Sequence, residues 1–92
     1  MKQDKLDGLY RAKVLDNQDP YNCERLLVQV DSVHEDGIGV WAEHISYSNR
    51  ISGDIPNVGD TVFIMFVKDF HLEYNPNDCV WIGKSNFKKG SL

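Results

Sequence analysis

Short stretches in which apolar and polar residues alternate follow one another along the chain, separated by residues typical of turns. Alternation with a period of two is typical of a β-strand that buries one face, whereas a helix needs a period of about 3.6 residues. The alternating stretches are residues 9–15, 25–31, 38–46, 61–67 and 79–83. The pattern therefore predicts an all-β protein with five short strands.

The stretch 61–67 is the most apolar of these and contains only β-branched, aromatic and methionine side chains. Alternation divides its large side chains between two faces, Val62, Ile64 and Phe66 on one and Phe63, Met65 and Val67 on the other. One apolar face can fill the core of a small domain, so the second face needs a cover. We expect that cover to be the chain's own loops or a partner.

A tight turn is predicted directly before this stretch. Pro56 fixes its own φ, and Asn57 and Gly59 supply the local hydrogen bonding and the permissive φ of such a turn. The strand should therefore begin near Asp60 or Thr61.

Two further turns are predicted earlier in the chain. In Asp19-Pro20 the carboxylate can accept backbone N–H bonds, and residues 16–24 around it are rich in Asp and Asn. Asp36-Gly37 is a hairpin signal between the second and third strands. The side chains expected to point inward from the first two strands are Tyr10, Ala12, Val14, Leu26, Val28 and Val30, with Arg11, Lys13, Arg25, Gln29 and Asp31 outward.

A projecting hairpin arm is predicted over residues 68–78, where Phe70, Leu72 and Tyr74 alternate with polar neighbours. We expect these three side chains, together with the outer face of 61–67, to form a protein interface. Residues 1–8 should be a loose polar leader that ends at Gly8, residues 9–85 the folded domain, and residues 86–92 a short polar tail. Residues 47–57 are expected to form a loop.

Five short strands separated by turn-rich loops predict a small antiparallel barrel. The leading form is the oligonucleotide/oligosaccharide-binding (OB) barrel, without the helix that often lies between its third and fourth strands. A barrel of the SH3 kind is the main alternative, and the pattern alone does not separate the two.

The 92 residues are enough for one domain, and their formal charge is −4. This charge is opposite to the basic surface that neutralises phosphates, so general nucleic-acid binding is disfavoured. No apolar run approaches the roughly 20 residues that span a bilayer, and no signal-peptide centre occurs near Met1. We therefore expect a soluble protein made in the cytoplasm, without membrane insertion, whose Cys23 and Cys79 remain thiols.

No motif predicts catalysis, a cofactor or a metal site. His34, His44 and His71 do not combine with the cysteines in any spacing typical of zinc ligands. The 14 carboxylates include no pair singled out by spacing, and neither a phosphate-binding glycine loop nor a nucleophile elbow is present.

Aromatic residues support one alternative function, a stacking platform for single-stranded nucleic acid. A platform also needs neighbouring Lys and Arg, and the last two strands have almost none before Lys68 and Lys84. We therefore prefer an interpretation in which the tryptophans fill or flank the core. The aromatic candidates are Tyr10, Trp41, Tyr47, Phe70, Tyr74 and Trp81.

Five fragments in order resemble the OB domain of phage baseplate hub and central-spike proteins, including the baseplate assembly protein V family and the valine-glycine-repeat spikes of type VI secretion. The fragments are Tyr10-x-Ala12-x-Val14-x-Asp16-Asn17-x-Asp19-Pro20, Arg25-x-x-Val28-x-Val30, Trp41, Ile55-Pro56-x-x-Gly59-Asp60-x-Val62-x-x-x-Phe66 and Val80-Trp81-Ile82-Gly83. They extend over about residues 9–85.

The resemblance implies a trimeric, non-catalytic ring domain in the virion, under the tail tube and in contact with other hub and spike proteins. The residues expected to build its turns and strand ends are Asp19, Pro20, Arg25, Pro56, Gly59, Asp60 and Gly83.

The chain departs from this family in two places. Glu24 stands where members usually carry Gly before the arginine that opens the second strand, so we expect the turn to be built differently, through a longer loop around Asn22. The larger relatives continue into a lysozyme domain or a β-helical needle, whereas this sequence stops at Leu92. If the chain is complete, a piercing tip must be a separate protein.

Overall fold

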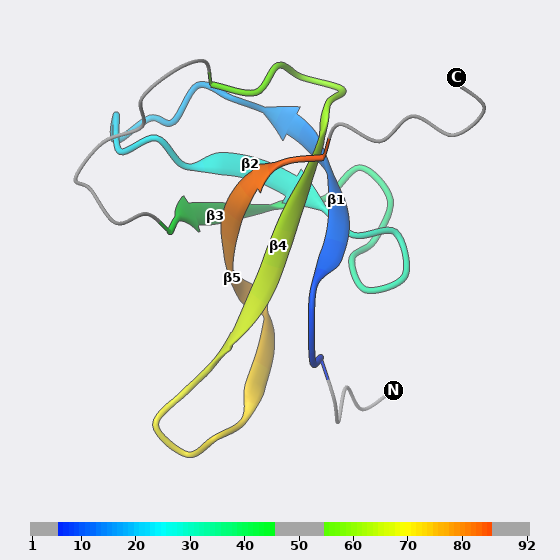
Figure 1. Cartoon of the computed structure of the whole chain (residues 1–92), viewed down its shortest axis with the longest axis vertical. Helices are drawn as coiled ribbons and strands as arrows, with labels where there is room; N and C mark the ends of the chain where they lie inside the picture. The colour runs from blue at the N-terminus through cyan, green and yellow to red at the C-terminus, as the bar shows by residue number, and fades with distance from the viewer. Residues whose placement is uncertain (1–5, 46–54, 86–92) are drawn as a thin grey trace.

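The computed structural model describes residues 6–45 and 55–85. Its strands are β1 (Tyr10–Asp16), β2 (Leu26–Gln29), β3 (Val40–His44), β4 (Thr61–Lys68) and β5 (Tyr74–Lys84). They close into a barrel in the order β1-β2-β3-β5-β4, and β4 pairs back onto β1 (Figure 1). The described residues contain no helix, so the predicted all-β, five-stranded OB-type barrel is confirmed. Residues 47–54 of the predicted loop between β3 and β4, and residue 46 at the end of the predicted third strand, lie outside the described ranges.

The strand pairing is mixed, which corrects the expectation of a fully antiparallel barrel. β3 and β5 run parallel, with Glu43 opposite Val80 and His44 opposite Trp81, while the other pairs are antiparallel. The reason is the strand order: β4 lies between β1 and β5, so an antiparallel β4–β5 hairpin leaves β5 running in the direction of β3. A simple meander, in which each strand pairs with the next, is thereby excluded.

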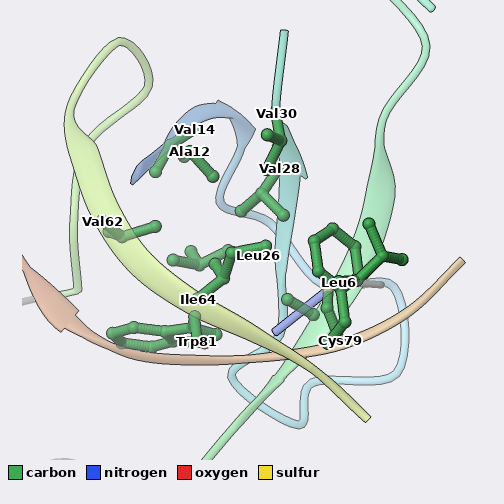
Figure 2. Close-up of a cluster of buried hydrophobic side chains, with 12 residues drawn as sticks. Leu6, Ala12, Val14, Leu26, Val28, Val30, Val62, Ile64, Cys79 and Trp81 are labelled. Atoms are coloured by element: carbon green, nitrogen blue, oxygen red, sulfur yellow. The ribbon is translucent and has the colours of Figure 1, made fainter. Parts of the chain in front are cut away.

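The hydrophobic core fills the barrel (Figure 2). On β4, Val62, Ile64 and Phe66 are buried, as the alternation predicts. Trp81 of β5 is also buried. Its ring is part of the core, as in the interpretation that we preferred over a stacking platform. The complete core cluster is Leu6, Ala12, Val14, Leu26, Val28, Val30, Ala42, Val62, Ile64, Phe66, Cys79 and Trp81.

Two residues are buried against expectation. Leu6, assigned to the loose leader, is only 2% exposed and joins the core, so the barrel includes the chain from residue 6 onward. Gln29, expected to point outward, is buried at the end of β2. Its amide nitrogen donates to the Asp31 carboxylate at 3.0 Å and its amide oxygen accepts from the Gly37 N–H at 2.9 Å. The turn after β2 folds over Gln29 because the side-chain amide of Gln29 provides hydrogen-bond partners for polar groups of the turn.

The turn at residues 56–60 forms as predicted. Gly59 has a φ of +93°, which favours glycine, and the Asp60 N–H donates to the Asn57 carbonyl at 3.0 Å. Asp60 also accepts the Asn57 N–H through its carboxylate, and β4 begins at the next residue. Gly83 of β5 pairs with Phe63 near the start of β4.

The predicted arm is the end of the β4–β5 hairpin, which extends below the barrel (Figure 1). β5 begins at Tyr74 rather than at residue 79 and has 11 residues, while β2 and β3 are shorter than expected. Pro76 lies where the register of β4 and β5 shifts, between the pairs Lys68–Tyr74 and Phe66–Cys79, and such an irregularity tolerates a residue without an N–H. The Pro76 carbonyl accepts a bond from His34 Nε2 at 2.7 Å. His34 Nδ1 accepts the Val30 N–H at 3.0 Å, so this histidine links the turn after β2 to the base of the arm.

Within the described residues, no helix has the length and apolar character needed to cross a bilayer.

Candidate functional site

The end of the arm, residues 69–73, is a closed turn organised by Asp69; we call it the arm tip. The Asp69 N–H donates to the Glu73 carbonyl at 2.9 Å, and the Leu72 N–H donates to the Asp69 carbonyl at 2.9 Å. One oxygen of the Asp69 carboxylate accepts the N–H groups of His71 at 2.8 Å and Glu73 at 3.0 Å. The backbone of the arm tip is therefore held in one conformation by local hydrogen bonds.

Two large apolar side chains lie unprotected on the arm tip. Phe70 is fully exposed and Leu72 is 74% exposed. Leu72 also has a φ of +62°, in the left-handed region, where a residue other than glycine pays about 1–2 kcal/mol. Backbone strain of this kind concentrates at functional sites. Exposure of both side chains, combined with strain at one of them, marks the arm tip as the candidate site.

Tyr74, the third predicted interface residue of the arm, serves as its anchor. Its ring packs against the core, and its hydroxyl donates to the Asp7 carboxylate. This hydrogen bond to a carboxylate raises the pKa of Tyr74, because ionised tyrosine could not donate it. Lys68 Nζ lies 5.0 Å from the centre of the ring. Tyr74 therefore positions the arm instead of being offered to a partner.

The outer face of β4 is partly covered by the chain itself. The guanidinium of Arg11 lies 5.3 Å above the Phe63 ring, and Val67 is half-buried. Met65 is 40% exposed and pairs with Val80 across the ladder. Of the predicted outer-face residues, Met65 is thus the one most available to a partner, beside the exposed Ile82 of β5.

The Asp19 turn is a structural corner, as its sequence predicts. The Asp19 side chain is only 3% exposed and accepts the backbone N–H groups of Tyr21, Cys23 and Arg25. Two nitrogens of the Arg25 guanidinium also donate to it, at 2.9 and 3.1 Å. The bond from Arg25 is the main reason why the pKa of Asp19 lies well below its usual range.

The turn before Arg25 differs from the expected longer loop. Glu24 itself adopts a φ of +63°, the conformation that a glycine would take, and Asn22 has a φ of +56°. The carbonyl of Glu24 accepts a bond from Trp81 Nε1 at 3.1 Å, so this strained residue is tied to the core. The turn therefore keeps the left-handed geometry without the glycine.

The aromatic residues of the described segments do not gather into a stacking platform. Trp81 is buried, and Tyr10 packs edge-on against Phe66 with ring centres 5.2 Å apart. Trp41 lies on the outside of β3, where the Arg25 guanidinium is 5.3 Å from its ring centre. Phe70 is at the arm tip, and Tyr47 lies outside the described residues. These positions separate the predicted stacking residues onto different surfaces.

The residues considered as metal ligands lie apart. Among residues 6–45 and 55–85, no group of three or more His, Cys, Asp or Glu side chains could hold a metal ion. Both cysteines are free thiols, Cys23 exposed and Cys79 buried, and burial raises the pKa of Cys79 to about 12. His44 stacks against Trp81, and His71 is exposed at the arm tip.

The role of Asp69 has a signal in the sequence, whereas the strain at Leu72 escapes a pattern-based prediction. Asp at the start of a polar turn does indicate local bonding to backbone N–H groups, and this signal is present in Lys68-Asp69. A left-handed leucine has no sequence signal.

No family model matches the chain, and no curated protein sequence matches it significantly. Its function is therefore inferred from the geometry of the barrel and the arm tip.

Proposed function

We propose that the protein is a non-catalytic structural subunit that assembles with other copies through its β4–β5 arm. The observation that carries this proposal is the arm tip, which offers Phe70 and Leu72 to solvent on a turn closed by Asp69. A turn with a fixed backbone loses little conformational freedom when it binds, so more of its contact energy remains for association.

The arm tip has the properties of an interface anchor. Burial of a side chain such as Phe or Leu contributes roughly 1.5–3 kcal/mol, and aromatic residues often dominate the energy of an interface. The isolated chain leaves this energy unused, because Phe70 and Leu72 contact solvent. Met65 and Ile82 are further exposed apolar side chains on the same hairpin.

The assembly proposed from the sequence resemblance is the baseplate hub or central spike of a phage tail. In this proposal the barrel is one member of a trimeric ring in the virion, and it joins the tail tube or hub to the spike tip. The net charge of −4 is consistent with protein partners and unfavourable for contacts with nucleic-acid phosphates. The closed barrel supplies a rigid frame from which the arm projects.

Sedimentation equilibrium of two variants tests the role of the arm. We expect Phe70→Ser to convert the oligomer into monomers while the circular dichroism spectrum stays unchanged. Tyr21→Ser is the matched control, because Tyr21 is also an exposed aromatic but lies in the Asp19 turn, away from the arm. Equal masses for the wild type and Phe70→Ser would contradict the proposal.

A further inference from the structure

A groove lies on the outside of the barrel beside the first half of β1. β1 pairs with β4 through Tyr10–Lys13, but its pairing with β2 begins only at Lys13. β2 ends at Gln29, and the chain then turns away, so residues 10–12 have no strand on that side. The groove here has a volume of about 520 Å³ and is lined by residues 10–13 of β1, residues 29–32, Gly59 and Thr61.

We propose that this groove receives the arm tip of a neighbouring copy of the chain. The inference rests on the proposed function and deepens it, because it names the surface that the arm contacts. Its basis is a match between the groove and the arm tip in charge and in size.

The charges of the two surfaces are opposite. In a protein with a net charge of −4, the groove presents the cations Arg11 and Lys13 and a single carboxylate, Asp31. Asp31 accepts a bond from the Gln29 amide, whereas Lys13 has no carboxylate partner among residues 6–45 and 55–85. The groove therefore offers positive charge that the described part of the chain does not neutralise.

The arm tip carries the complementary charge. Asp69 and Glu73 flank Phe70 and Leu72, and the tip contains no Lys or Arg. The Asp69 carboxylate is occupied by backbone N–H groups, which leaves Glu73 as the carboxylate available to a cation of the groove. Electrostatic complementarity of this kind sets the orientation of two docked surfaces.

The groove is also large enough for the side chains of the arm tip. The volume lies within the range of roughly 300–1,000 Å³ found for sites that enclose a small ligand, so the side chains at the end of a hairpin can enter it.

The contact must join different copies, because the arm tip extends well away from the barrel of its own chain (Figure 1). The arm and the groove are different surfaces, so the contact is heterologous. Heterologous contacts close into rings when the rotation between neighbours permits it. Such a ring is the form of assembly in the proposed function.

Charge reversal with rescue tests this pairing. Lys13→Glu and Glu73→Lys each place like charges at the contact, and we expect each to weaken association in sedimentation equilibrium by about ten- to a hundredfold. The double variant restores opposite charges between neighbouring copies and should recover most of the wild-type association. Glu43→Lys is the matched control, since Glu43 is exposed on β3 and does not line the groove. Association of the wild type should also weaken as salt is added.

The outcomes separate this inference from the proposed function. Suppose that the wild type is oligomeric and that Phe70→Ser dissociates it. If the charge reversals then have no effect, or if the double variant is not rescued, the arm docks elsewhere and the groove is not its binding site. A monomeric wild type would overturn both. If circular dichroism shows that a single variant is unfolded, the salt dependence of the wild type is the test instead. Wild-type association that does not change with salt overturns the charge pairing.

Discussion

The Asp19 side chain accepts five hydrogen bonds, three from backbone N–H groups and two from the Arg25 guanidinium. We expect Asp19→Asn to lower the melting temperature near neutral pH by several degrees, because the amide loses the ionic bond to Arg25. The pKa of Asp19 is lowered in the folded chain, whereas an unfolded Asp titrates near about 3.9. Its stabilisation is therefore present above about pH 4 and is lost as the pH falls toward the folded-state pKa.

Thermal melts followed by circular dichroism at neutral and acidic pH provide the measurement. The wild type should lose more stability on acidification than Asp19→Asn, whose side chain does not titrate. Glu35→Gln is the control, because Glu35 is an exposed carboxylate whose side chain makes no hydrogen bond or ion pair within the described residues. Parallel pH profiles for the wild type and Asp19→Asn would contradict the assignment.

Glu24 adopts a backbone conformation that is strained for glutamate and unstrained for glycine. We expect Glu24→Gly to be more stable than Glu24→Ala by about 1 kcal/mol in urea unfolding, because both variants remove the side chain and only glycine relieves the strain. The bond from Trp81 to the Glu24 carbonyl remains possible in both. Equal stabilities would mean that the positive φ carries no cost here.

These two residues also show what local sequence can and cannot predict. The bonds of Asp19 reach residues two to six positions away, so the Asp-Pro turn indicates them directly. The φ of Glu24 is imposed by the turn and by the contact of its carbonyl with Trp81, 57 positions away. No property of glutamate predicts that conformation.

At the scale of a strand, the two faces of β4 predict different losses of stability for substitutions at two adjacent residues. Ile64→Ala should cost about 2–5 kcal/mol of unfolding free energy, because Ile64 is fully buried, and Ile64→Val about 0.5–1.5 kcal/mol. Met65→Ala should cost less than about 1 kcal/mol, since its side chain is on the outer face. Urea unfolding in the Phe70→Ser background removes any contribution from assembly. Similar costs at both positions would contradict the assigned faces of β4.

The strands could be predicted to different degrees. β4 has large apolar side chains on both faces, and its period, length and start are all evident from the sequence. Leu6 could not be placed, because a single leucine among charged residues has no period, although its side chain is part of the core. The start of β5 at Tyr74 was also unpredictable, since Asn75-Pro76-Asn77 is typical of a turn. This segment lies in the strand because Tyr74 beside it pairs with Lys68 and the Pro76 carbonyl accepts a bond from His34.

At the scale of the molecule, the order of the strands is the feature that periodicity does not encode. The parallel contact between β3 and β5 joins residues about 37 positions apart, Glu43 with Val80 and His44 with Trp81. The fold class follows from five short strands, whereas this closure depends on long-range pairing. The groove beside β1 could not be predicted for the same reason, since it exists only because β2 ends early.

The closed barrel also predicts how the two thiols react. In the native protein, a thiol reagent at mildly alkaline pH should label Cys23 and leave Cys79 unmodified, because Cys79 is buried and its pKa is raised to about 12. Both should react in denaturant. Cys23→Ser is the control and should show no rapidly reacting thiol. Equal labelling of both cysteines in native protein would mean that the barrel opens readily.

The most direct test of assembly through the arm is the solution mass of a chain whose arm tip has been removed. Replacement of residues 69–73 by Asn-Gly supplies a two-residue hairpin turn and keeps the pair of Lys68 and Tyr74 at the end of the ladder. Sedimentation equilibrium should give three times the mass of one chain for the wild type and a single-chain mass for the shortened variant, with the same circular dichroism spectrum. A monomeric wild type, or a shortened chain that still forms the trimer, would contradict the account.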